Sequence, residues 1–318
     1  MDKPLSIYVH IPFCEKRCPY CDFVSGEVRD VDIYIEEVCS DVKKQSAKCK
    51  DYTVNTIYFG GGTPSLIDAE YIVKLLDVIR ENYVVEKGAE ITIECNPNSI
   101  SREKFDIYRR SGINRISIGV QSFCNVCLGI LGRVHDVKQA KSAIELACEM
   151  FDNVSIDLIH SIPNGRPKLP SKYIAMVQHI SAYALTSDKY EPVPDEQSIA
   201  EQKRFEKTFK EYGLEKYEVS NFAKRGFESR HNLNYWRCGE WFGFGMGAKG
   251  HFGEPWDNQD RIMLGLRTAE GISRDLLKGK EAKIDELVNL GLLKCENGRV
   301  CCTQRGFLLL NRVILELI

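Results

Sequence analysis

The stretch LSIYVHIPFCEKRCPYCDF, at residues 5–23, decides how this chain is interpreted. Residues 5–10 are mostly apolar, aromatic or β-branched, a composition that predicts a β-strand. A loop with three cysteines follows at once, with Cys14, Cys18 and Cys21 in the spacing C-x-x-x-C-x-x-C. Three thiols this close together indicate a metal-binding loop that leaves the first strand.

Strand-like and helix-like segments alternate from this strand onward. Strands are expected at 5–10, 54–59, 90–95, 114–120, 153–159 and 179–185, and helices at 31–45, 68–83, 101–111, 137–150 and 196–213. Asp68 and Ser101 are the expected N-caps of their helices. Regular alternation predicts a parallel sheet with right-handed crossovers. No glycine-rich dinucleotide fingerprint follows the first strand, which favours a barrel or an open half-barrel over a Rossmann sheet.

The alternation stops near residue 221, and residues 221–253 are rich in glycine and aromatics without a clear period. Helices around 258–269, 281–290 and 305–317, with a hairpin at 292–303, indicate a small winged-helix-like module. We therefore predict an α/β fold with a partial (β/α)6 barrel over residues 1–220 and a C-terminal domain over residues 221–318.

The composition excludes several classes of protein. The 318 residues include 43 Lys and Arg against 45 Asp and Glu, a net charge of −2 that gives no global attraction for nucleic acid. A hydrophobic share of 43% is too high for a disordered chain. No apolar run approaches the roughly 20 residues of a membrane span, and the N-terminus lacks a signal peptide pattern. A cytoplasmic protein without a membrane span is expected.

The chain has 13 cysteines, which in a reducing compartment argue for metal binding and buried thiols rather than disulfides. The three in the first loop would lie at the C-terminal face of the barrel, where such folds keep their active sites. Structural zinc usually takes four ligands as two separated pairs, whereas a thiolate trio on a [4Fe–4S] cluster leaves one iron open. The cluster is the favoured interpretation, with zinc as the alternative.

Further candidate residues follow the later strands. Gly60-Gly61-Gly62-Thr63-Pro64 follows the strand at 54–59, and such a run lets a ligand approach the backbone, although an ordinary turn is the alternative. No Lys-Ser/Thr follows, so it is not a P-loop. Polar side chains also stand at or near strand ends, where they could hold a ligand or pair with one another: Glu94, Gln121, Arg133 and Asp157.

The segment YVHIPFCEKRCPYCDF resembles the opening motif of radical S-adenosylmethionine (SAM) enzymes, in the form found in the coproporphyrinogen oxidase-like branch. The resemblance implies that Cys14, Cys18 and Cys21 hold a [4Fe–4S] cluster whose open iron binds SAM. In that family an electron from the cluster cleaves the sulfonium and releases a 5′-deoxyadenosyl radical, so the cofactor carries the difficult chemistry. It also implies a set of SAM contacts, namely Tyr8, Tyr20, Gly61, Gly62, Thr63, Glu94, Gln121, Arg133 and Asp157.

Within this branch the segment SRHNLNYW, at 229–236, is similar to the HNxxYW segment linked to haem in HemW-type haem chaperones. The resemblance implies that His231 is an axial haem ligand and that Tyr235 and Trp236 pack on the porphyrin, whereas a lone histidine could also be structural. It implies haem, haem-accepting proteins and an electron donor as partners of a monomer or homodimer. No catalytic residue is assigned.

Two other functions remain open at this stage. One is an oxygen-independent coproporphyrinogen III oxidase, a radical enzyme that oxidatively decarboxylates propionates. Such oxidases carry a further cysteine just after the trio, where this chain has Asp22. The other is a zinc-stabilised nucleic-acid-binding protein, but the C-terminal module lacks a dense Lys/Arg stripe, so no nucleic acid is expected.

The chain also departs from the family. The segment Ile162–Pro170 and the segment after Phe252 are short, which predicts a reduced barrel helix and a reduced C-terminal domain. Cys124-x-x-Cys127 lies where the family has no cysteines. It is interpreted as a structural pair facing a helix, with a redox pair as the alternative.

Overall fold

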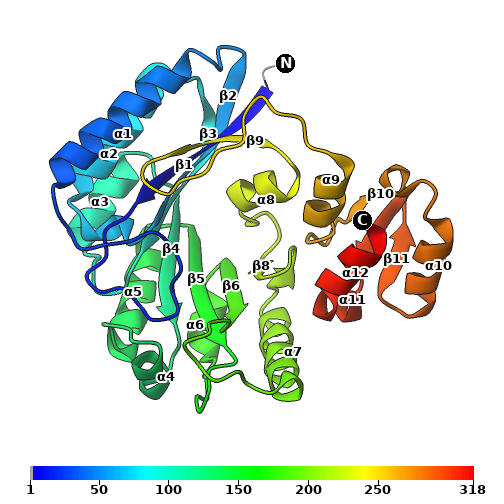
Figure 1. Cartoon of the computed structure of the whole chain (residues 1–318). Helices are drawn as coiled ribbons and strands as arrows, with labels where there is room; N and C mark the ends of the chain where they lie inside the picture. The colour runs from blue at the N-terminus through cyan, green and yellow to red at the C-terminus, as the bar shows by residue number, and fades with distance from the viewer. Residues whose placement is uncertain (1–2) are drawn as a thin grey trace.

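The computed structural model describes residues 3–318 as one long sheet with helices, followed by a smaller sheet (Figure 1). The strands of the long sheet are β1 (Lys3–Ile11), β2 (Tyr52–Gly61), β3 (Val85–Cys95), β4 (Arg115–Gln121), β5 (Asn153–His160), β6 (His179–Ala184), β7 (Glu215–Lys216), β8 (Asn221–Ala223) and β9 (Glu240–Phe244). The helices of this part are α1 (Val31–Ser46), the 3-10 turn η1 (Pro64–Leu66), α2 (Ala69–Asn82), α3 (Arg102–Arg110), α4 (Asn125–Ile130), α5 (Val137–Met150), α6 (Ser171–Met176), α7 (Asp195–Glu211) and α8 (Arg230–Trp236).

The strands β1 to β6 are parallel, and each pairs with the next along the chain. β9 joins the free side of β1 in parallel, and β8 pairs antiparallel with β6. Over residues 3–318 the order is β7-β8-β6-β5-β4-β3-β2-β1-β9, with β7 and β9 as the two edges. The sheet is therefore open, which confirms the predicted partial barrel.

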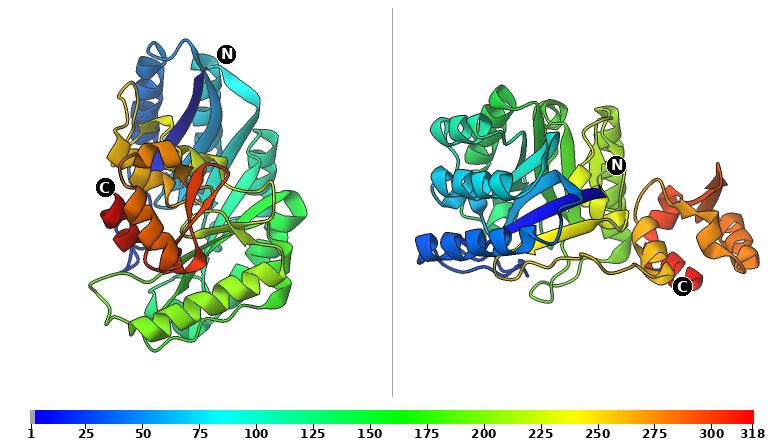
Figure 2. Two further views of the ribbon diagram at one scale, coloured as in Figure 1. Left: turned by 90° about the vertical axis from the view of Figure 1, so that its right-hand side faces the viewer. Right: turned by 90° about the horizontal axis from the view of Figure 1, so that it is seen from above.

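The outer face of the sheet carries the main hydrophobic core. Apolar residues of α1, α2, α3 and α5 pack there against every second residue of the strands (Figures 1 and 2). On β3, Ile91, Ile93 and Cys95 lie in this core, while Glu94 points the other way and contacts Tyr58. The period of two in the sequence thus sets which side chains face the core and which face the concave side.

The opposite, concave side of the sheet, here called the inner face, is polar. Its side chains bond to one another and so offset the cost of burial. Thr56 donates to Ser6 over 2.7 Å, and Ser155 bonds to His179 over 2.8 Å. Each of the six parallel strands contributes polar residues to this face, among them Ser6, Tyr8, Thr56, Tyr58, Glu90, Glu94, Arg115, Ser117, Ser155, Asp157 and His179.

Residues 221–253, for which the sequence indicates no period, contain α8 and β9. α8 is two turns long and is capped by Ser229, whose side chain accepts from the Asn232 N–H. β9 is stabilised by its pairing with β1, far away in the sequence, and by an antiparallel bridge between Trp241 and His251. Elements this short carry little local periodicity, so their formation depends on tertiary contacts.

The C-terminal residues form a second core around a three-stranded sheet in the order β10-β12-β11. The elements are α9 (Asn258–Gly265), β10 (Ile272–Ser273), η2 (Arg274–Leu277), α10 (Glu281–Asn289), β11 (Leu293–Glu296), β12 (Arg299–Cys302), α11 (Gln304–Leu308) and α12 (Leu310–Leu317). The single helix predicted at 305–317 is two, because the backbone leaves the helical region at Leu309. The break directs Leu310, Val313 and Leu317 into the second core.

The expected boundary between residues 220 and 221 falls inside the long sheet, because β8 and β9 belong to it. Phe252 still packs against the first core, whereas Ile262 belongs to the second. We propose a boundary between these two residues. Figure 2 shows the second unit to one side of the long sheet. Within residues 3–318 no helix has the length and apolar character that crossing a membrane requires.

Candidate functional site

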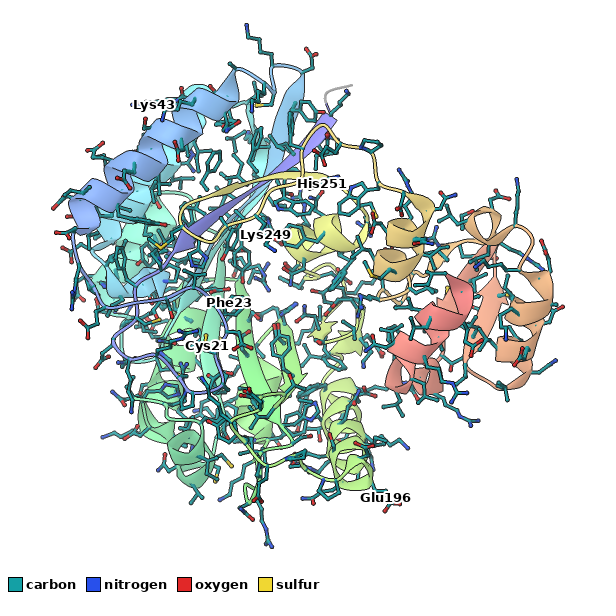
Figure 3. The ribbon with its side chains drawn as sticks, in the orientation of Figure 1. Cys21, Phe23, Lys43, Glu196, Lys249 and His251 are labelled. Atoms are coloured by element: carbon teal, nitrogen blue, oxygen red, sulfur yellow. The ribbon has the colours of Figure 1, made fainter. Side chains whose placement is uncertain are left out.

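The three cysteines lie on the loop between β1 and α1, at the carboxyl ends of the parallel strands, where Figure 3 labels Cys21 and Phe23. Two backbone hydrogen bonds of 2.8 Å fasten the loop: Gly26 donates to Pro12, and Cys14 donates to Gly26. All three thiols are free and partly exposed. Burial raises the pKa of Cys21, and the nearby Cys18 and Cys14 thiols add to the rise.

The donor set suits an iron–sulfur cluster. Over residues 3–318 no three thiol, imidazole or carboxyl side chains converge as the ligands of a single metal ion do. The ligands of a cubane cluster need not converge in that way, because each thiolate binds a different iron. Metal binding here would release the thiol protons, since only the thiolate ligates.

The glycine turn after β2 lies directly against the cysteine loop. Gly62 donates to the Ile11 carbonyl over 2.8 Å, and Thr63 donates to the Phe13 carbonyl over 2.7 Å. Gly61 has a φ of +113°, and a Cβ there would lie 2.5 Å from the His10 ring. A Cβ on Gly62 would lie 2.6 Å from the Phe13 carbonyl oxygen. Only glycine fits this close approach of two backbones.

Asn96 links the glycine turn to Arg133. Its amide nitrogen donates to the Thr63 hydroxyl over 2.9 Å, and its oxygen accepts from Arg133 Nη2 over 2.6 Å. Arg133 Nη1 in turn lies 3.3 Å from Tyr20 Oη and 3.6 Å from the Cys18 sulfur. The Cys14 sulfur lies 3.8 Å from Thr63 Oγ1. The structure thus joins the cysteine loop, the glycine turn and Arg133 in one network.

Glu94 lies under the same turn. Its carboxylate accepts from the Tyr58 hydroxyl over 2.8 Å and from the Gly61 N–H over 3.1 Å. Burial raises the pKa of Glu94 to about 7, and the neighbouring Asp157 charge adds to the rise. A carboxylate beside a glycine turn can accept hydrogen bonds from an amino group.

The remaining predicted contacts surround this point. Tyr8 bonds through its hydroxyl to His10 Nδ1 over 3.0 Å, and its ring stacks on Tyr58 with centroids 6.1 Å apart. Asp157 accepts from the Ser117 hydroxyl over 3.3 Å, and burial raises its pKa. Gln121 ends β4 with a φ of +61°, a conformation rare for a residue with a side chain. A Cβ placed on Gly119 would lie within 3.4 Å of Gln121, Asn96 and Arg133 side-chain atoms alike.

His231 lies on the inner face on α8, away from the cysteine loop. Its Nδ1 bonds to Thr56 Oγ1 and its Nε2 to Tyr235 Oη, both over 2.7 Å, and the residue is 1% exposed. Burial, with a smaller contribution from the nearby Arg115 charge, lowers the pKa of His231 to about 3, so the imidazole is neutral at pH 7. Its ring stacks on Tyr58, the residue that also bonds to Glu94. Trp236 does not share this environment, because it packs under the Arg267 guanidinium.

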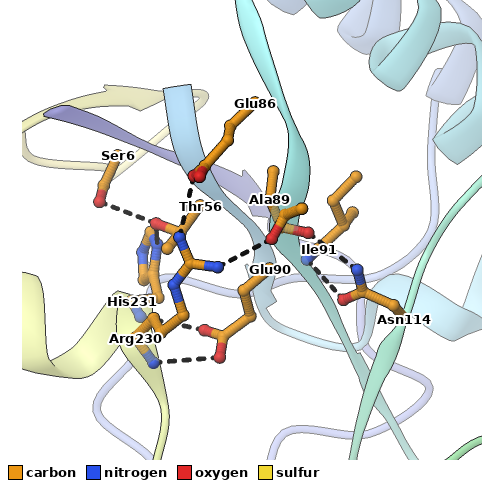
Figure 4. A network of polar contacts seen from close by, with 10 residues as sticks. Ser6, Thr56, Glu86, Ala89, Glu90, Ile91, Asn114, Arg230 and His231 are labelled. Carbon is orange, nitrogen blue, oxygen red and sulfur yellow. Dashed lines mark hydrogen bonds and ion pairs between the residues drawn. The ribbon is translucent and has the colours of Figure 1, made fainter. Parts of the chain in front are cut away.

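Glu90 holds α8 in place (Figure 4). Its carboxylate accepts from the backbone N–H groups of Arg230 and His231, each over 3.0 Å, at the N-terminus of the helix. The Arg230 side chain also reaches Glu86 over 3.0 Å and the Gly88 carbonyl over 2.8 Å. α8 is therefore tied to β3 by both its backbone and its first side chain.

The sequence interpretation missed Asn96, Tyr58 and Glu90. Asn96 had a usable signal, since it directly follows the strand predicted at 90–95, as other candidate residues follow theirs. Tyr58 and Glu90 gave no such signal, because each lies inside a strand and its partners are distant in the sequence.

An open, mainly parallel sheet with a three-cysteine loop after its first strand and a glycine turn after its second defines a protein of the radical SAM class. The family model of the radical SAM superfamily matches residues 8–165. The structure is similar to the coproporphyrinogen III oxidase HemN from Escherichia coli, with a TM-score of 0.80 over 99% of this chain and 90% of that one. Identity is 20%, so this likeness concerns the fold.

Sequence similarity narrows the class. The chain is 38% identical to the heme chaperone HemW of Escherichia coli (strain K12) over 265 residues, 78% of this chain and 70% of that protein. It is 30% identical to HemW of Bacillus subtilis (strain 168) over an alignment of 371 positions, 97% of each chain. The chain belongs to the HemW family. That alignment is longer than the chain, so the relative carries residues that this chain lacks, in keeping with the short segments noted above. Membership implies a [4Fe–4S] cluster and SAM as cofactors.

Proposed function

We propose that this chain is a haem chaperone, which binds haem and passes it to haem-requiring proteins. The main support is that the sequence of this chain is similar to relatives named heme chaperone HemW over most of their length. The HNxxYW segment at His231 adds to this support. In this proposal haem-accepting proteins and an electron donor are its partners.

The proposed cofactor site uses the network around the cysteine loop. Cys14, Cys18 and Cys21 hold the cluster, which supplies the electron for SAM cleavage when bound. Gly61, Gly62, Thr63 and Glu94 receive the amino end of SAM. The other proposed contacts, from the strand ends and the cysteine loop, are Tyr8, Tyr20, Gln121, Arg133 and Asp157. Replacing Cys18 by alanine abolishes the absorbance near ~400 nm expected of a thiolate-held cluster.

The proposed haem ligand is His231, and its surroundings set a condition. A neutral imidazole ligates iron, but its Nε2 is bonded to Tyr235 and the ring is covered. Haem ligation therefore requires that Tyr235 be displaced and that α8 move relative to β3. In this proposal Tyr235 competes with the iron for the imidazole nitrogen.

The test is an anaerobic haem titration of the cluster-loaded protein, followed through the Soret band. The wild type gives a saturable shift, and His231→Ala loses it. Tyr235→Phe removes the competing hydrogen bond, whose net value is about 1 kcal/mol, so haem binds about fivefold more tightly. Tyr71→Phe, at a partly buried tyrosine bonded to Asp32 on the outer side of the sheet, is the matched control and leaves haem affinity unchanged.

Two results would contradict the proposal. If the wild type shows no Soret shift, the protein does not bind haem. Decarboxylated products from coproporphyrinogen III would then indicate the oxidase instead. A shift that survives in His231→Ala and is unaltered in Tyr235→Phe places the haem ligand elsewhere.

A further inference from the structure

Cys124 and Cys127 lie together at the start of α4, just beyond the end of β4. Cys124 is the N-cap residue of this helix, and Cys127 is in its first turn. Cys124 is partly exposed, whereas Cys127 is fully buried. One thiol of the pair is accessible from solution, and the other is held behind it.

The two cysteines pack in the same small cluster of side chains. The nearby backbone N–H and thiol of Cys127 lower the pKa of Cys124, with a smaller contribution from Lys168. Burial raises the pKa of Cys127. The thiolate is the attacking species in sulfur chemistry, so the accessible cysteine is the nucleophile and the buried one is its partner.

The spacing allows a disulfide without unfolding the helix. Residues three apart across a first helical turn have Cα atoms about 5–6 Å apart, inside the range that disulfides span. Cys127 packs with Leu131, Ile159 and Ile162, and a Cβ on Gly165 would lie 3.1 Å from its sulfur. This packing shields Cys127 from external oxidants and leaves Cys124 as the route to it.

The pair lies beside the cysteine loop. Tyr20, from that loop, packs on the same small cluster of side chains as Cys124 and Cys127. At the far end of α4, a Cβ on Gly132 would lie 2.8 Å from Pro19, and Arg133 contacts Cys18 and Tyr20. One short helix thus connects the dithiol to the loop that carries the three cysteines.

We propose that Cys124 and Cys127 form a thiol–disulfide exchange site that reacts with low-molecular-weight disulfides. The Cys124 thiolate attacks one sulfur of a disulfide RSSR and forms a mixed disulfide, and one thiolate RS⁻ leaves. The Cys127 sulfur, losing its proton, then attacks the Cys124 sulfur and expels the second RS⁻. The dithiol is oxidised by two electrons, RSSR is reduced, and the two dithiol protons end on two RSH. This site is independent of the proposed haem and SAM chemistry.

The experiment uses the full-length, cluster-loaded protein under anaerobic conditions, so that the three loop cysteines are ligated. The protein is equilibrated with mixtures of glutathione and glutathione disulfide, quenched in acid, alkylated and digested with trypsin. Cleavage after Arg115 and Arg133 gives one peptide, residues 116–133, whose only cysteines are Cys124 and Cys127. Mass spectrometry distinguishes the doubly alkylated dithiol, the mixed disulfide and the internal disulfide.

The internal reference is Cys238, partly exposed and alone in the tryptic peptide 238–249. We expect the internal disulfide of 116–133 to form at a glutathione disulfide concentration at least about tenfold below that which modifies Cys238. Cys127→Ser, and Cys127→Ala if the serine variant is unstable, arrests the reaction at a mixed disulfide on Cys124. Cys124→Ser leaves Cys127 unmodified.

The proposal is overturned if peptide 116–133 remains a dithiol where Cys238 already carries glutathione. It is also overturned if Cys124 stays unmodified in the Cys127 variants. Neither outcome depends on haem binding, so this test and the haem titration fail or succeed separately.

Discussion

At the scale of single residues, the inner face shows how charge is accommodated inside a sheet. Glu94 and Asp157 are both buried carboxyls, and Arg115 is a buried guanidinium, only 2% exposed, that lowers the pKa of both. Burial nevertheless dominates and leaves the pKa of Glu94 at about 7. A group that titrates near neutrality beside the glycine turn gives a pH dependence that can be measured.

The affinity for SAM is expected to depend on pH through Glu94. Below pH 7 this carboxyl holds a proton, and only its ionised form accepts hydrogen bonds from the SAM amino group at both oxygens. Affinity therefore rises as the pH rises through 7 and falls about tenfold per pH unit below it. Isothermal titration calorimetry of the cluster-loaded protein with SAM measures this.

Glu94→Gln is the matched control, because it keeps the shape of the side chain and removes the proton. Its SAM affinity should be weak and nearly independent of pH between about 6 and 8. An identical pH profile in wild type and variant would show that another group titrates.

At the scale of elements, the helix N-termini show why N-cap residues of the same type contribute differently to the stability of the fold. Asp136 caps α5 with a complete capping box, accepting from the Gln139 N–H over 2.8 Å while the Gln139 side chain accepts from the Asp136 N–H over 2.9 Å. Ser101 caps α3 as predicted. Asp68 occupies the predicted N-cap position of α2, but its side chain makes no capping bond.

These caps predict different costs of substitution. Asp136→Ala loses a bonded cap and should lower the free energy of unfolding by about 1 kcal/mol. Asp68→Ala loses only the favourable charge near a helix N-terminus and should cost a few tenths of that. Urea unfolding followed by circular dichroism at one pH compares the two variants. If both variants lose the same free energy of unfolding, the hydrogen bond of the Asp136 cap does not stabilise the protein.

At the scale of the whole molecule, buried histidines make the fold sensitive to acid. Burial is the main cause of lowered pKa values at His135 and His160, both about 4, at His231, about 3, and at His179. In the unfolded chain these groups titrate at their ordinary value, so below pH 6.5 the unfolded state binds more protons. Acid therefore favours unfolding through each of them.

The free energy of unfolding is expected to fall as the pH is lowered from about 6.5 to about 5, by up to about 1.4 kcal/mol per pH unit for each histidine. Glu94 and Glu218, whose pKa values burial raises to about 7, oppose this, because below pH 7 the folded state retains their protons. Asp157, whose pKa burial also raises, acts in the same direction as these two carboxyls, whereas His10, whose pKa burial lowers, adds to the loss. Five histidines outnumber three carboxyls, so the net effect is a loss.

Urea unfolding at several pH values measures this loss. His160→Gln should reduce the slope by about one proton's contribution. A slope that is zero, or the same in wild type and variant, would refute the assignment to the histidines.

Local patterns in the sequence determined most of the architecture. The six parallel strands, the helices covering their outer face, the cysteine loop and the glycine turn all have signals within about ten residues, because each depends on backbone propensity and side-chain alternation. For the same reason the period of two along residues 90–95 places Glu94 on the face of β3 opposite to Ile91, Ile93 and Cys95.

Only the tertiary structure decided the rest. β9 pairs with β1 across more than two hundred residues, α8 is held by Glu90 of β3, and Asn96 joins Thr63 to Arg133. The burial of His231 also arises in this way, since its partner Thr56 is 175 residues away. Such contacts depend on how the sheet curves and on which later segments pack over its inner face. No local sequence pattern determines that packing, because it joins residues far apart in the chain.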